Sequence, residues 1–255
     1  MAAIRAAMLL TLVAGCDQQM DVGSNILWTA RFEGNSFDEW TSVSGGGASV
    51  LNDQNIMEVS SEDAHKSALS AKLITYAPPG VFQGNVSFSR TGYLPTEAYY
   101  SAWYNLPRTV SVGVYWVIMK FRQRTVVDDA STERELFDLN LKTLGSGGMS
   151  LRVYSHQNGG GDLALSVPED PVVPVGPWFQ IEAFYRAAAD SSGRLTFWLD
   201  GQQILDLRGP TGPTPWVAWD VVSVAQSLTP DTATLFVDDC AISLSRVGPS
   251  GLIAR

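Results

Sequence analysis

The sequence predicts an all-β protein in which two antiparallel sheets pack face to face as a sandwich. Short runs rich in Val, Ile, Phe, Tyr, Trp and Thr alternate with clusters of Gly, Pro, Asn, Asp and Ser along most of the chain, a spacing typical of sandwiches and barrels. Helical periodicity is confined to one short stretch, Asp63–Ser67. The chain has 255 residues, 45% of them hydrophobic, which is enough to bury the core of one large β domain.

Each predicted strand is an apolar or alternating run that ends at turn residues. In chain order the clearest runs are Tyr99–Leu106, Val114–Arg124, Glu135–Lys142, Ser150–Gln157, Phe179–Ala187, Arg194–Leu199, Trp219–Ser227 and Thr234–Leu244. Gly145–Gly148 and Asn158–Gly161 separate neighbouring runs, because glycine tolerates the positive φ angles of tight turns. Asp200-Gly201 predicts a hairpin that joins Leu195–Leu199 to Gln203–Leu207.

The N-terminus reads as an export signal. Arg5 is followed by an uncharged apolar run, Ala6–Gly15, which is too short to span a bilayer as a helix. The stretch Leu12-Val13-Ala14-Gly15-Cys16 resembles the lipobox of bacterial lipoproteins, whose cysteine receives a diacylglyceryl group and becomes the first mature residue. The resemblance implies a protein exported and lipid-anchored to a bacterial membrane, on the periplasmic side or at the cell surface, that contacts the membrane through its lipid alone.

The predicted domains follow from this reading. Residues 1–15 form the signal peptide, 16–26 the lipidated Cys16 and a tether, 27–247 a single β domain and 248–255 a C-terminal tail. Cys240 then has no partner within the chain and lies in an apolar run, so we expect a buried thiol. There is no zinc or redox motif, and we expect no required cofactor. The net charge of −9 argues against a nucleic-acid binder, which needs a broad basic surface.

Several segments look familiar in their order and spacing. WTARFEGNSFDEW at Trp28–Trp40, YYSAWYNLP at Tyr99–Pro107, the hairpin at Trp178–Asp206 and LFVDDCAISL at Leu235–Leu244 resemble strands of concanavalin A-like jelly rolls. The similarity covers roughly residues 27–246 and is greatest to the polysaccharide-lyase-like and laminin-G-like branches. It implies a two-sheet antiparallel jelly roll. Lectins, glycanases, lyases and non-catalytic domains share this fold, so the fold leaves the function open.

The same resemblance raises a structural calcium ion, which many of these domains hold between their first and last strands. Glu33 and Asp239 offer two of the oxygens that calcium prefers. The alternative is that these are strand-end carboxylates that accept turn hydrogen bonds.

Two sets of catalytic motifs found in relatives of this fold, those of glycosidases and those of alginate lyases, are missing from the sequence. The glycosidase pair Glu-x-Asp-x-x-Glu, which supplies an acid and a nucleophile, has no match here. The Gln-x-His and Tyr-x-Lys-x-Gly-x-Tyr motifs of alginate lyases are absent as such. A retaining glycanase is therefore disfavoured.

Alternation along three runs nonetheless predicts a ligand site. Side chains on a strand alternate between faces, and one face would gather Trp116, Lys120, Arg122, Asn140, Arg152, Tyr154 and His156. This basic, aromatic face suits an anionic polysaccharide, because Arg binds carboxylates bidentately and aromatic rings stack on sugars. The plain alternative is an ordinary solvated sheet face, which is polar in any sandwich.

The leading functional prediction is a membrane-anchored, extracytoplasmic protein that binds an acidic glycan on its concave sheet. One alternative is a uronate-specific lyase that acts by β-elimination. In that case Arg152 or Arg122, with Asn140, would neutralise the carboxylate. His156 or Tyr154 would exchange protons, since general bases work best near the ambient pH. A third possibility is a structural or adhesion lipoprotein that contacts other proteins.

Overall fold

A computed structural model of the chain describes residues 25–45, 54–92, 94–127, 130–157, 160–167, 169–212 and 217–250. The predicted signal peptide, Cys16, most of the tether and the last five residues of the tail lie outside the described residues. Within them the protein is all-β with two antiparallel sheets, which confirms the predicted fold class. No helix in this part of the chain is long and apolar enough to cross a membrane.

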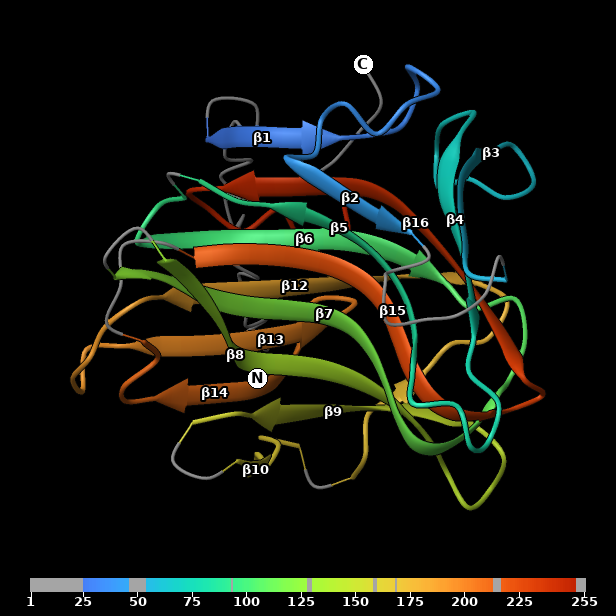
Figure 1. The fold of residues 1–255 in the computed structure, drawn as a ribbon. Coiled ribbons are helices and arrows are strands. Elements are labelled where there is room, and N and C mark those ends of the chain that lie inside the picture. The colour runs from blue at the N-terminus through green and yellow to red at the C-terminus, as the bar shows by residue number, and fades with distance from the viewer. Residues whose placement is uncertain are drawn as a thin grey trace, which may run out of the picture.

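The first sheet, sheet A, has eight strands (Figure 1). Its order is β14 (Gln202–Arg208), β13 (Arg194–Leu199), β12 (Trp178–Arg186), β6 (Glu97–Asn105), β16 (Thr232–Ser243), β4 (Ser70–Tyr76) and β3 (Ile56–Ser60), with β1 (Ile26–Ala30) also paired to β16. The last strand of the chain thus lies between β6 and β4, in the interior of the sheet.

The second sheet, sheet B, also has eight strands. Its order is β10 (Gly161–Asp162), β9 (Met149–Ser155), β8 (Ala130–Thr143), β7 (Ser111–Val127), β15 (Val217–Thr229), β5 (Gly84–Arg90) and β2 (Ser42–Gly45), with β11 (Val172–Val173) also paired to β9. Figure 1 shows that β7, β15 and β5 curve along their length. Since β15 pairs with both β7 and β5, segments distant in sequence meet in the middle of this sheet.

All eight of the clearest predicted strands are present, and so is the predicted hairpin. Asp200 and Gly201 have φ angles of 47° and 82°, the positive values that the turn between β13 and β14 requires. The strands between Ile26 and Arg90 were outlined less clearly by the sequence. β2 and β5 read SVSG and GNVSFSR, and their Ser, Asn and Gly residues dilute the β-branched and aromatic pattern.

The core between the sheets is rich in aromatic side chains. Phe121 of sheet B stacks on Tyr185 of sheet A, with ring centroids 4.7 Å apart and an interplanar angle of 8°. Such a pair adds about 0.5–1.5 kcal/mol beyond the burial of its area. Cys240 is fully buried, as predicted, and its thiol is free.

Two irregularities in the middle of sheet B decide which side chains leave this core. The pairing of β7 with β8 shifts between Val117 and Met119, and the pairing of β15 with β7 shifts between Val221 and Val224. A β-bulge inserts a residue, bends the strand and breaks the two-residue alternation of its faces. The outer face of sheet B therefore does not follow simple alternation along β7.

Candidate functional site

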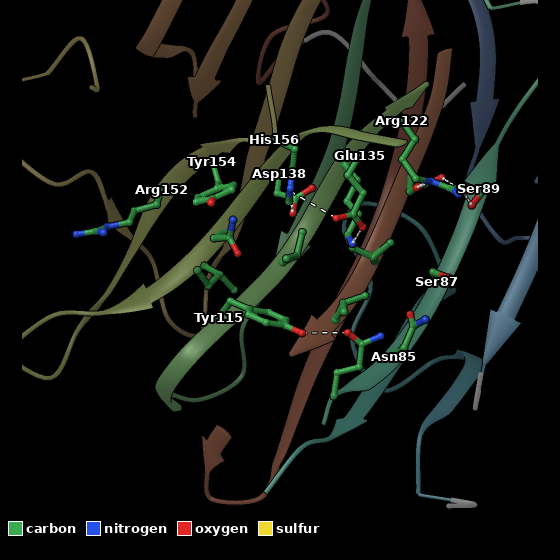
Figure 2. Close-up of a pocket in the computed structure, with 18 of the residues that line it drawn as sticks. Asn85, Ser87, Ser89, Tyr115, Arg122, Glu135, Asp138, Arg152, Tyr154 and His156 are labelled. Atoms are coloured by element: carbon green, nitrogen blue, oxygen red, sulfur yellow. Dashed lines mark hydrogen bonds and ion pairs between the residues drawn. The ribbon is translucent and has the colours of Figure 1, made fainter. Parts of the chain in front are cut away.

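A groove with a volume of about 1210 Å³ lies on the face of sheet B that points away from the core. Five neighbouring strands, β9, β8, β7, β15 and β5, supply most of its lining (Figure 2). Polar and charged side chains dominate it, among them Asn85, Ser87, Ser89, Tyr115, Lys120, Arg122, Glu135, Asp138, Asn140, Arg152, Tyr154, His156 and Asp220.

The groove contains six of the seven residues that the sequence predicted for ligand binding: Lys120, Arg122, Asn140, Arg152, Tyr154 and His156. Their three runs are adjacent strands, as the prediction required. Asp138 pairs with Tyr154, and Asn140 with Arg152, across β8 and β9. Whether these side chains bind a ligand stays a prediction, but they do share one face.

The seventh residue, Trp116, was placed on the wrong face. It is fully buried in the core, and its indole N–H donates to the Ser223 hydroxyl over 2.9 Å. The physical reason is the bulge in β7. Ile118 and Met119 both point into the core, so Tyr115 and Val117 line the groove before the bulge and Lys120 lines it afterwards.

Sequence reasoning also missed most of the acidic residues of the groove. Counting back from Asn140 in steps of two reaches Asp138, which lines the groove. Before Asp138 the pairing of β8 with β7 shifts again, and Leu136 and Phe137 are both buried. Two-residue alternation therefore does not predict that Glu135 lines the groove. Asp220 is the one charge in the apolar run Val217–Val222, and that isolation was a usable signal.

These carboxylates correct the expectation of a basic face. Each cation of the groove has an acidic partner. Lys120 pairs with Glu135, and Arg152 pairs with Asp162. Arg122 contacts two carboxylates, and is held by Glu133 and by both oxygens of Asp220. The described lining is therefore a network of ion pairs with mixed charge.

His156 is the group of this network that can change its protonation near neutral pH. Its Nε2 lies 2.8 Å from Asp138 Oδ2 and 3.5 Å from Glu135 Oε2. The hydrogen bond to Asp138 raises the pKa of His156 and outweighs partial burial, which acts in the opposite direction. Burial by itself would raise the pKa of the neighbouring Glu135, but the charge and hydrogen bond of Lys120 lower that pKa overall.

The surroundings of His156 resemble those of a proton-transfer site. The ring of Tyr154 meets the imidazole edge to face, with centroids 4.9 Å apart. Asp138 is 5% exposed, and its Oδ1 has no hydrogen-bond partner among the described residues. A carboxylate that orients an imidazole beside a tyrosine, at the wall of an open groove, can support general acid–base chemistry.

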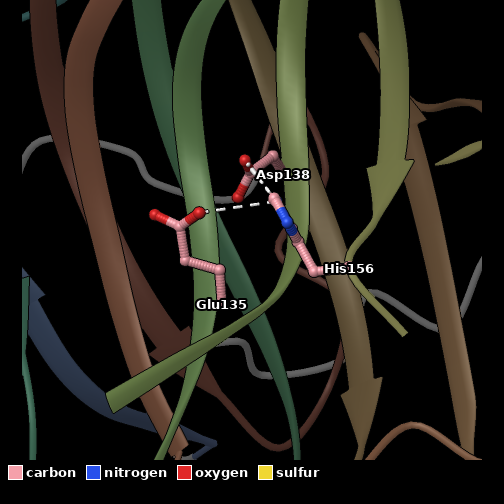
Figure 3. A group of neighbouring side chains, drawn as sticks. All are labelled: Glu135, Asp138 and His156. Atoms are coloured by element: carbon pink, nitrogen blue, oxygen red, sulfur yellow. Dashed lines mark hydrogen bonds and ion pairs between the residues drawn. The ribbon is translucent and has the colours of Figure 1, made fainter. Parts of the chain in front are cut away.

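His156 and its two carboxylate neighbours form a cluster of three possible metal ligands (Figure 3). Glu135, Asp138 and His156 each offer one ligand atom, all within 4.8 Å of one another. A divalent cation there would have to displace the Lys120 ammonium from Glu135 and the proton shared by Asp138 and His156. We therefore interpret the cluster as an ion-paired proton site.

The calcium site implied by resemblance does not fit the contacts of Glu33 and Asp239. Glu33 Oε1 accepts the backbone N–H groups of Ala68 and Leu69, at 3.0 and 2.8 Å. Asp239 contacts the Arg31 guanidinium at 3.4 Å and the His65 ring at 2.8 Å. Both carboxylates thus have protein partners, one of them a cation, and calcium prefers a shell of six to eight oxygens. We assign calcium no role.

Comparison with known proteins finds similar folds among solved structures. No family model and no curated protein sequence matches the chain. Solved structures do match. An endo-β-1,4-glucuronan lyase from the fungus Trichoderma reesei has a TM-score of 0.67 at 14% identity, covering 89% of this chain and 100% of its own.

An alginate lyase in complex with an alginate trisaccharide has a TM-score of 0.58 at 12% identity, covering 86% of this chain and 98% of its own. The cellulose induced protein Cip1 has a TM-score of 0.58 at 16% identity, and the match covers 86% of this chain and 98% of its own. At these identities the likeness establishes the fold alone: this chain is a β-sandwich jelly roll of the shape that several polysaccharide lyases share.

Proposed function

We propose that the protein binds a uronate-containing polysaccharide in the groove of sheet B. The observation that carries this is the groove itself, an open site of about 1210 Å³ that crosses five strands. Pockets for drug-sized ligands hold about 300–1,000 Å³, so this site suits an oligosaccharide segment. The alginate trisaccharide bound by one structural neighbour supports the proposal by analogy of fold.

Arg152 is the best-placed group to contact a uronate carboxylate. Its side chain is 40% exposed and paired with Asp162, which is itself 50% exposed. Exposed ion pairs are worth only about 0–1 kcal/mol, so a sugar carboxylate can compete for the guanidinium. Arg122 cannot be recruited in the same way, because Asp220 and Glu133 already hold it. Asn140, opposite Arg152 in the sheet, adds an amide that can bond sugar hydroxyls.

The test is isothermal titration of the purified protein with oligosaccharides of alginate, glucuronan, pectate and heparin type. We expect Arg152→Ala to weaken binding roughly tenfold, the loss of one charge-assisted hydrogen bond. Arg186→Ala is the matched control. Arg186 is 43% exposed and paired with a 48% exposed Glu97, but it lies on sheet A, away from the groove. Absence of binding across the panel, or equal losses in both variants, would refute the proposal.

Lyase activity is the second candidate, favoured by the contact of His156 with Asp138 and Tyr154. In β-elimination a base takes the C5 proton of the uronate, the C4–O4 bond breaks, and a C4–C5 double bond forms. A proton from an acid then completes the leaving oxygen. His156 and Tyr154 are close enough to serve as this base and acid, and Arg152 or Asn140 would stabilise the charged carboxylate.

Ultraviolet absorbance of the unsaturated product separates the two candidates in the same samples. A lyase gives rising absorbance that both His156→Gln and Tyr154→Phe abolish. A binding protein gives heat of binding with flat absorbance. Tyr154→Phe changes a partly exposed side chain, so we expect little loss of stability. In His156→Gln the glutamine amide can still donate a hydrogen bond to Asp138, which limits the loss.

We also propose that the protein acts outside the cytoplasm, held to a membrane by lipid on Cys16. The five residues that end at Cys16 are the support for this. Mass spectrometry of the mature protein should find a diacylglyceryl-modified Cys16 as its first residue, and Cys16→Ser should release the protein from membranes. Cys240→Ala is the control, since that thiol is buried. An unmodified Cys16 would refute the anchor.

A further inference from the structure

On the side formed by β7, β15 and β5, the lining of the groove changes from charged to uncharged along the strands, whereas β8 and β9 keep charged side chains, Lys142 and Arg152, at the uncharged level. Along β15 its lining positions run Asp220, Val222, Val224, and along the partner strand β7 they run Arg122, Lys120, Val117, Tyr115. The change from charged to uncharged occurs at paired positions of the two strands: Asp220 is opposite Lys120, and Val224 is opposite Val117. On the other side of β15, β5 contributes Ser89, Ser87 and Asn85, none of them charged. We call the uncharged part, Asn85, Ser87, Tyr115, Val117, Val222 and Val224, the uncharged floor.

The uncharged floor has an apolar centre with hydrogen-bonding groups around it. Val117, Val222 and Val224 form a cluster separate from the main core, and Tyr115 packs against it. The Tyr115 hydroxyl donates to Gln83 Oε1 over 2.9 Å. Asn85 Oδ1 has no hydrogen-bond partner among the described residues. Apolar atoms ringed by amides and hydroxyls suit an uncharged sugar, which has C–H faces and hydroxyl edges.

A carboxylate is poorly matched to this floor. The pairing across β15 puts Val224 between Val117 and Asn85, and Val222 beside Ser87, so no cation stands next to either valine in the sheet. A charged group that loses water without a partner is strongly disfavoured. In addition, the described lining holds the carboxylates of Glu133, Glu135, Asp138, Asp162 and Asp220, each near a cation that a sugar carboxylate would need. A chain with a negative charge on every sugar would meet repulsion along the groove.

We infer that the ligand is a heteropolysaccharide in which an uncharged sugar lies next to a uronate. The uronate occupies the side of the groove formed by β8 and β9, where it reaches Arg152, while the uncharged sugar occupies the uncharged floor on the side of β15 and β5. This inference rests on the proposed glycan-binding function and adds the substrate class. It separates this protein from one built for a homopolymer of uronates.

The test compares two glucuronate oligosaccharides of equal length by isothermal titration. One is a glucuronan fragment, and the other alternates glucuronate with N-acetylglucosamine, as in hyaluronan. We expect the alternating chain to bind at least tenfold more tightly. Ser87→Lys adds a cation beside the valines at a partly exposed position, and it should tighten glucuronan binding and shrink the preference. Ser61→Lys, on an exposed loop that does not line the groove, should change neither.

The outcomes distinguish the heteropolysaccharide ligand from glycan binding in general. Glucuronan binding as tight as that of the alternating chain, with no effect of Ser87→Lys, overturns the heteropolysaccharide inference and leaves glycan binding intact. No heat from any oligosaccharide, including the wider panel above, overturns both. Ser87→Lys leaves Val117, Val222 and Val224 in place. The test therefore does not depend on a variant that disturbs the packing of the uncharged floor.

Discussion

Among the ion pairs of the groove, the pair between Arg122 and Asp220 should contribute most to the free energy of unfolding. Asp220 is 3% exposed at its side chain and Arg122 is 19% exposed. Both carboxylate oxygens of Asp220 accept hydrogen bonds from the guanidinium, one of them over 2.9 Å. In Asp220→Asn one of these oxygens becomes an amide donor that faces another donor, and the charge of Arg122 stays partly buried.

The expected loss in the free energy of unfolding is about 3 kcal/mol. Removing one partner of a buried pair costs about 3–5 kcal/mol, and Glu133, which still contacts Arg122, keeps the loss near the lower limit. For a domain of this size each kcal/mol lowers Tm by roughly 2–4 °C, so Tm should fall by about 6–12 °C. Urea unfolding followed by tryptophan fluorescence gives the free energy directly.

Asp162→Asn is the control for this prediction. It makes the same chemical change in the exposed pair with Arg152, and exposed pairs contribute about 0–1 kcal/mol. We expect burial, and not the mere presence of an ion pair, to set the loss in the free energy of unfolding. Equal losses in Asp220→Asn and Asp162→Asn would refute it.

Three further predictions follow from the site and the core. Trp116→Phe should lower the free energy of unfolding by about 1–3 kcal/mol in urea titrations while glycan affinity stays unchanged, because Trp116 packs in the core; a selective loss of affinity would contradict the buried placement. His156 has a raised pKa when folded, so its bond to Asp138 stabilises the protein fully below about pH 6.5, and that stability is lost as the pH rises through the folded-state pKa. Asp138→Asn should lower the pKa of His156 in an NMR titration; an unchanged pKa would show that Asp138 is not its cause. Gly193→Ala should destabilise the fold by about 1–3 kcal/mol in thermal unfolding, since a Cβ there collides with the backbone oxygen of Gly209; an unchanged Tm would contradict the close approach.

The sequence predicts the fold well because its strongest signals are local. Strands such as Phe179–Ala187 carry dense aromatic and aliphatic residues between turn residues, and the Asp200-Gly201 turn specifies its own hairpin. The early strand β5 is harder to predict, since its outward Ser and Asn residues weaken the strand pattern. Those same small polar residues line the groove.

The candidate site was predictable where alternation is regular and unpredictable where it is broken. Arg152, Tyr154 and His156 follow the two-residue period of β9 and its extension, and all three line the groove. In β7 a bulge reverses the faces, so Trp116 points inward. Neither the bulge nor the pairing of distant β15 with β7 has a local signature, and Asp220 reaches Arg122 only through that pairing.

The most direct test of glycan binding in the groove is NMR of the two histidine imidazoles during titration with uronate-containing oligosaccharides. The chain has two histidines. His156 lines the groove, whereas His65 is buried against Trp103 of sheet A, with ring centroids 3.6 Å apart. We expect the His156 resonances to shift in proportion to saturation while those of His65 stay in place. Binding that leaves the His156 resonances unmoved, or that shifts only those of His65, would contradict it.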